Sequence, residues 1–179
     1  MSMDTRWENV DELLKRSERT KDEALVKAAQ NIAGQRFEFP TQEYPAYRTH
    51  LNVPNVTMGV QVGDEEIDPT IVVVERVNTG ETRLVMTAEV CIREQVTDGE
   101  AKRVWSRIAS IPNQAFYLYV PVGYGSEAKK ICRRLGIRPE GFRTYRTTPR
   151  GFEVNDISER PSPLAPLMPP IVRRLLATP

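Results

Sequence analysis

Two carboxylates stand near the ends of consecutive segments that are predicted to form strands, and they are the first candidates for chemistry. Asp68 precedes a run of four apolar β-branched residues, and Glu89 lies within the stretch MTAEVCIRE. Carboxylate oxygens are ligands for hard divalent cations. However, Asp68 stands before a proline, where an aspartate commonly caps a turn. Glu89 has apolar neighbours, so we expect it to be partly buried and to need a partner such as Arg83, Arg93 or a helix residue.

The thiols and the single histidine offer a second kind of chemistry. Cys91 and Cys132 are far apart in the sequence, so they provide neither a disulfide framework nor a metal-ligand spacing. We expect both to be buried, reduced thiols. A Cys–His dyad would need His50 beside one of them, and nothing in the sequence places it there. The GYGS stretch at residues 123–126 resembles an anion-binding helix start, but it lacks the lysine and the third glycine of the known motifs.

Charge is unevenly distributed along the chain, although the net charge is only +1. Residues 38–100 carry 12 acidic and 4 basic side chains, whereas residues 129–150 carry 8 basic and 1 acidic. A basic helix followed by an Arg-rich hairpin can follow a phosphate backbone, with non-specific and salt-sensitive binding. Such binding would be centred on Arg133, Arg134, Arg143 and Arg146. The alternative is that the acidic and basic halves neutralise each other, within the fold or across a dimer.

The hydrophobic pattern predicts the elements that would position these side chains, in the order α-β-β-β-α-β-α-β(β). A helix is expected over residues 9–34, followed by a long irregular segment that is rich in proline. Strands are expected over residues 56–62, 70–77 and 82–92. A helix then begins at the capping box Thr97-x-x-Glu100, and its buried stripe includes Trp105 and Ile108. Both are predicted to pack beneath the following strand.

The second half of the chain continues the alternation of strands and helices. The remaining predicted elements are a strand over residues 115–121, a helix capped by Ser126 and ended by Gly136, and two short strands within residues 137–154. This order is typical of an α/β fold with a central mixed sheet and helices on both faces. Residues 1–157 are predicted to form one domain. Residues 158–179 are a proline-rich tail that we expect to lie in a groove of this subunit or of a neighbour.

The length and the apolar runs set further expectations. A chain of 179 residues is long enough for one domain with a proper core. Its longest apolar runs are only as long as strands, so no membrane partner is expected. The charged start of the sequence lacks the apolar core of a signal peptide. We therefore expect a cytoplasmic protein.

The stretch IDPTIVVVERVNTGETRLVMTAEVC, together with the helix, strand and helix predicted after it, resembles a known family. Over residues 56–145 the chain is similar to the core of the PD-(D/E)XK nuclease-like superfamily, also called restriction-endonuclease-like. In that superfamily an acidic residue opens one strand, and an acidic-x-lysine triplet lies on the next, antiparallel strand. The resemblance implies that two carboxylates hold Mg²⁺ and that the lysine orients or activates the attacking water.

Matched residue by residue, the chain departs from that motif. Thr70 stands at the position of the family's aspartate, and Asp68 lies two residues before it. Glu89 fits the acidic position of the triplet, but Cys91 stands at the lysine position. A shift of two residues is about 6.6 Å along a strand, which is large beside a metal–oxygen distance of about 2.1 Å. Arg93 could replace the missing cation, but it is a poor proton acceptor.

The main hypothesis is a nuclease-like domain without hydrolytic activity and without a cofactor, which acts as a binding or assembly module. Its predicted partners are nucleic acid, through residues 129–150, and a second copy of the chain, through the tail. One alternative is an active Mg²⁺-dependent nuclease that uses Asp68 and Glu89, with Glu75 or Glu23 as an extra ligand. Another is a scaffold protein with neither nucleic acid nor metal, whose apolar tail swaps onto a partner.

Overall fold

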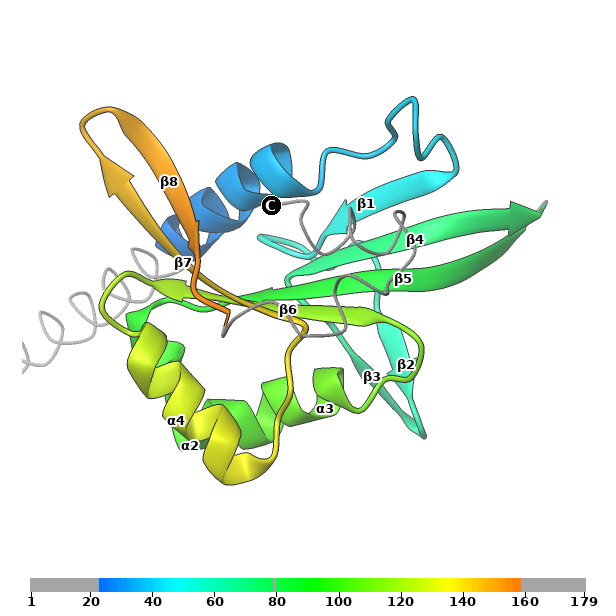
Figure 1. The fold of residues 1–179 in the computed structure, drawn as a ribbon. Helices are drawn as coiled ribbons and strands as arrows, with labels where there is room; N and C mark the ends of the chain where they lie inside the picture. The colour runs from blue at the N-terminus through cyan, green and yellow to red at the C-terminus, as the bar shows by residue number, and fades with distance from the viewer. Residues whose placement is uncertain (1–22, 79, 159–179) are drawn as a thin grey trace, which may run out of the picture.

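The structure, a computed structural model, describes residues 23–78 and 80–158 (Figure 1). Their strands are β1 (Tyr47–Leu51), β2 (Val60–Val62), β3 (Glu65–Ile67), β4 (Ile71–Asn78), β5 (Glu81–Val90), β6 (Ala115–Pro121), β7 (Gly141–Thr148) and β8 (Gly151–Asp156). Within the described residues, one curled sheet has six strands in the order β1-β4-β5-β6-β7-β8, and β2 pairs separately with β3. Strands β1, β4 and β5 are antiparallel, β6 is parallel to β5 and β7, and β8 is antiparallel to β7. The prediction of a mixed sheet is confirmed.

Helices cover both faces of this sheet, as the sequence predicts. The helical residues 23–36 lie on one side of the sheet, and the other helices of the described residues lie on the opposite side (Figure 1). These are the 3₁₀ turn η1 (Arg93–Gln95), α2 (Asp98–Glu100), the π-helical turn η2 (Ala101–Trp105), α3 (Ser106–Ala109) and α4 (Gly125–Leu135). Because α2, η2 and α3 follow one another without a break, they form a single helix in place of the predicted one.

Local sequence signals fix the ends of these helices. The Thr97 side chain accepts a hydrogen bond from the Glu100 amide at 3.2 Å, so the predicted cap is confirmed. Gly136 ends α4 in the left-handed region at φ 71°, also as predicted. The start of α4 differs by two residues, because Tyr124 and not Ser126 is its N-cap. The helix begins at a buried glycine, Gly125, where an added Cβ would lie 2.5 Å from Ile157 Cδ1.

Each face of the sheet has its own apolar core. The core under α2, α3 and α4 contains Trp105 and Ile108, both fully buried, with the inward residues of β6, Phe116, Leu118 and Val120. This confirms the prediction that the helix packs beneath that strand. The core on the other face is formed by helical residues 23–36 and by alternate residues of the central strands. Side chains alternate along each strand, so neighbouring residues enter different cores.

The segment before the central strands is where the sequence prediction is wrong. β1 lies in the proline-rich stretch that was expected to be irregular. The strand can form there because Pro45 and Pro54 flank it, so neither removes a hydrogen-bond donor from the pairing of β1 with β4. The strand predicted over residues 56–62 is reduced to β2, which pairs outside the main sheet. The N-terminal part of the predicted first helix and the C-terminal tail after residue 158 lie outside the described residues. None of the described helices is long and apolar enough to cross a membrane.

Candidate functional site

Glu89 lies near the end of β5, beside the residue that precedes β4. The register pairs Ile71 with Ala88, which places Thr70 next to Glu89. The backbone N–H of Thr70 donates to Glu89 Oε2 at 3.0 Å. In return, the backbone N–H of Val90 donates to Thr70 Oγ1 at 3.2 Å. The structure therefore brings Thr70 and Glu89 together, and Thr70 is hydrogen-bonded both to Glu89 and to Val90.

The Glu89 carboxyl is buried, with 7% of the residue exposed. Burial raises its pKa from the ordinary value of 4.5 to about 7. Backbone and side-chain hydrogen bonds from Thr70 oppose this rise, as does the positive charge of Arg103, whereas the charge of Glu100 adds to it. A carboxyl with a pKa of about 7 is protonated in about half of the molecules at neutral pH.

The partners of Glu89 are not the arginines suggested by the sequence. Arg83 forms an ion pair with Glu75, which joins β5 to β4. Glu75 would have to give up this ion pair to act as the extra metal ligand of the active-nuclease hypothesis. Arg93 lies over the ring of Tyr124, with its guanidinium carbon 5.8 Å from the ring centroid. The carboxyl is satisfied locally by Thr70, a contact that depends on the strand register and so could not be read from the sequence.

A polar cavity of about 300 Å³ lies beside Glu89. Its charged and amide side chains are Glu66, Asp68, Glu89, Gln95, Glu100, Arg103 and Arg107. Asp68 is exposed and lines this cavity from the short segment between β3 and β4, so it is not on a strand. The two arginines are engaged, because Arg103 pairs with Glu100 at 2.8 Å and Arg107 pairs with Glu65.

The donor groups at this place do not fit a divalent cation. Within residues 23–78 and 80–158, no three His, Cys, Asp or Glu side chains gather in a way that could hold a metal ion. Thr70 supplies a hydroxyl where the PD-(D/E)XK motif has a carboxylate. Glu89 already accepts a hydrogen bond from the backbone amide of Thr70. Cys91 is fully buried, and burial raises the pKa of its thiol well above 9.0. A neutral thiol is neither a ligand for hard Mg²⁺ nor a base.

The cysteines agree with the sequence analysis. Cys91 and Cys132 are both buried and free, and each belongs to the core under α4. Burial raises the pKa of the Cys132 thiol to about 12. Neither thiol is therefore available as a nucleophile at neutral pH.

The four arginines of the predicted nucleic-acid surface do not lie together. Arg133 and Arg134 are exposed on α4, and Arg134 pairs with Asp98. Arg146 is exposed on β7 and pairs with Glu153 at 2.7 Å. Arg143 is only 2% exposed and lies on the face of the sheet opposite to α4. The reason is the alternation along β7, which turns odd-numbered residues away from that helix.

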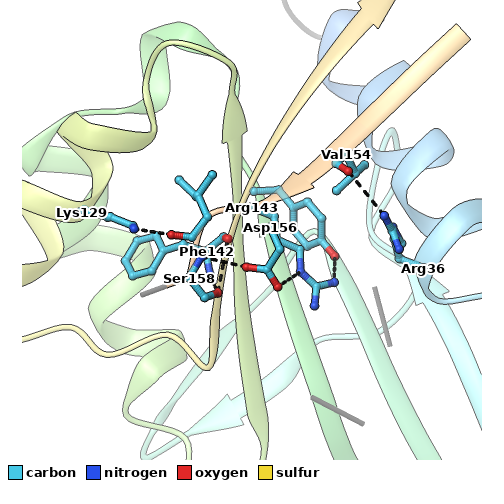
Figure 2. Close-up of polar contacts among 9 residues, drawn as sticks. Arg36, Lys129, Phe142, Arg143, Val154, Asp156 and Ser158 are labelled. Carbon is cyan, nitrogen blue, oxygen red and sulfur yellow. Dashed lines mark hydrogen bonds and ion pairs between the residues drawn. The ribbon is translucent and has the colours of Figure 1, made fainter. Parts of the chain in front are cut away.

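A second cavity, of about 310 Å³, lies on the face that Arg143 enters. Its aromatic and basic lining is Arg36, Phe37, Phe39, Tyr44, Tyr117 and Arg143. Figure 2 shows Arg143 beside Asp156, and Arg36 near Val154. The sequence analysis did not predict this cavity, because the stretch FEFPTQEY belongs to the proline-rich segment that was expected to be irregular. The available signal was an arginine directly before these aromatic residues.

Comparison with protein-family models, with curated proteins and with solved structures finds no match for this chain.

Proposed function

We propose that this chain is a PD-(D/E)XK-like domain without hydrolytic activity, which serves as a binding module. The order of the elements supports the proposal. A helix over residues 23–36 precedes the antiparallel strands β1, β4 and β5, which are followed by the helix α2–α3, the parallel strand β6 and α4. The superfamily's core has the same sequence of a strand, an antiparallel strand with the triplet, a helix, and a strand-helix unit. Thr70 and Glu89 are neighbours where such a motif has its acidic residues.

The main support for the absence of hydrolysis is the hydrogen bonding between Thr70 and β5. The carboxylate that would be a metal ligand accepts the Thr70 amide at 3.0 Å, and the Thr70 hydroxyl accepts the Val90 amide at 3.2 Å. Metal-dependent phosphodiester hydrolysis needs a fixed cation and an activated water. A threonine and a neutral, buried Cys91 in the motif supply neither a second carboxylate nor a base.

A cleavage assay tests this proposal. The purified full chain is incubated with supercoiled DNA, single-stranded DNA and RNA in the presence of Mg²⁺ or Mn²⁺, and we expect no cleavage above the background without protein. The informative comparison restores the motif with Thr70→Asp and Cys91→Lys, after circular dichroism has confirmed that the variant folds. Cleavage gained by the variant supports the ancestry. Wild-type cleavage that Glu89→Gln abolishes would show that the proposal is wrong.

Nucleic acid is the partner class that the charge distribution favours for the binding role. The exposed basic residues that remain candidates are Arg133 and Arg134 on α4 and Arg146 on β7. Arg143 adds no charge to that surface, because it is buried on the other face. Phosphate contacts of this kind are non-specific and weaken as salt is added.

A further inference from the structure

The cavity beside Arg36 and Arg143 has no part in the proposed function, since it lies on the opposite face of the sheet from Glu89. Its volume of about 310 Å³ is at the lower end of the range for small-molecule sites. It combines two guanidinium groups with aromatic walls. Sites of this composition select ligands by charge and by ring shape together.

Both guanidinium groups are held in place by the fold. Arg143 Nη1 donates to the Tyr119 hydroxyl at 3.0 Å, its Nε lies 3.7 Å from Asp156 Oδ2, and its guanidinium carbon is 4.9 Å from the Tyr117 ring centroid. Arg36 Nη2 donates to the carbonyl oxygen of Val154 at 3.5 Å (Figure 2). Burial and the charge of Arg143 both lower the pKa of Arg36. Two cations that repel each other in a partly buried place favour the entry of an anion.

Arg36 Nε and the Tyr44 hydroxyl, two buried polar atoms of the lining, have no hydrogen-bond partner within the described part of the chain. Buried polar atoms almost always have a partner, so an unmatched pair in one cavity calls for an explanation. A ligand that accepts hydrogen bonds would satisfy both atoms, because both residues line the same cavity.

Aromatic side chains form much of the remaining lining, together with Thr41, Gln42, Glu43 and Met86. Phe39 and Tyr44 meet edge to face, with their ring centroids 6.0 Å apart. Phe37 contacts Tyr117 in the same manner at 6.1 Å. These rings present apolar edges and faces against which a flat ring can pack. Inorganic phosphate would leave this part of the cavity unfilled, and a neutral ring would make no use of the positive charge of the two guanidinium groups.

We propose that this cavity binds a small anion that carries a flat ring, with its phosphate or carboxylate at Arg36 and Arg143 and its ring against Phe39 and Tyr44. The source of the anionic group is distinguished by two probes, adenosine monophosphate for a phosphate and 4-hydroxybenzoate for a carboxylate.

Isothermal titration calorimetry on the full chain tests the proposal. Adenosine monophosphate and 4-hydroxybenzoate are titrated beside adenosine, which lacks the anion, and inorganic phosphate, which lacks the ring. We expect at least one ring-bearing anion to bind at least tenfold more tightly than both adenosine and phosphate. If neither ring-bearing anion exceeds these two controls, the proposal is wrong.

Two substitutions locate the binding. Tyr44→Phe removes only the unpartnered hydroxyl, so the affinity of the probe that binds should fall several-fold while the melting temperature of the free protein does not fall. Arg36→Gln should lower the affinity at least tenfold. The matched controls are Tyr47→Phe, whose ring stacks on Tyr44 at 4.9 Å but does not line the cavity, and the exposed Arg76→Gln. Binding that survives both test substitutions unchanged would place the ligand elsewhere and overturn the proposal.

Discussion

Replacement of Glu89 by glutamine should make the protein more stable, and the gain should grow with pH. The folded protein raises the pKa of this carboxyl from 4.5 to about 7, chiefly through burial. Each pKa unit corresponds to about 1.4 kcal/mol, so the rise amounts to about 3 kcal/mol. Because only 7% of the Glu89 residue is exposed, solvent screening reduces this value little.

The sign follows from proton linkage. The folded state holds the Glu89 proton more tightly than the unfolded chain does, so this group favours folding fully below about pH 4.5. That contribution is lost as the pH rises through about 7, where the folded protein must carry a buried charge. Glutamine resembles the protonated carboxyl and never ionises. The difference in unfolding free energy between Glu89→Gln and wild type should therefore increase by about 3 kcal/mol between about pH 4 and pH 8.

Urea denaturation at a series of pH values measures this difference. The control is Glu81→Gln, at an exposed position on the same strand, which accounts for the loss of a charge alone. A difference between Glu89→Gln and wild type that stays constant across the series would refute the reasoning. So would a loss of stability in Glu89→Gln that grows with pH, since it would mean that the charged carboxylate has a strong partner.

Two further predictions concern the core and the surface. Trp105→Ala should lower the unfolding free energy by about 3–5 kcal/mol, because the side chain is fully buried in the core under α2 and α3; a loss below about 1 kcal/mol in urea denaturation would argue against that packing. Arg133→Glu combined with Arg134→Glu should weaken retention of nucleic acid at low salt and flatten its salt dependence, whereas Arg76→Glu on β4 should not. If filter binding detects no retention by the wild type at low salt, nucleic acid is not the partner.

The elements that the sequence predicted well are those with strong local signals. The strand over residues 115–121 has its predicted bounds, because a continuous apolar run is bounded by turn residues on both sides. Thr97 and Gly136 fix helix ends through contacts within a few residues of themselves. Glu89 was expected to be buried for the same kind of local reason, its apolar neighbours, and it is.

The features that the sequence did not reveal depend on contacts between distant residues. β1 becomes a strand because β4 offers it an edge, which no property of its own five residues predicts. The contact between Glu89 and Thr70, which are 19 residues apart in the sequence, follows from the register of β4 and β5. The sequence does not distinguish Arg143 from the exposed Arg146 on the same strand, yet the alternation of side chains along β7 buries Arg143 on the opposite face of the sheet. The cavity that it lines brings residues from 36–44 together with Met86, Tyr117 and Arg143. These residues are too far apart in the sequence for a local pattern to predict that they meet.

Calorimetric titration of the wild-type chain with Mn²⁺ and with Mg²⁺ tests most directly whether Thr70 and Glu89 can hold a divalent cation. We predict no heat of binding that depends on Glu89, because its carboxyl is buried, hydrogen-bonded to Thr70 and about half protonated at neutral pH. A site of one cation per chain that Glu89→Gln removes and Glu81→Gln preserves would contradict the account.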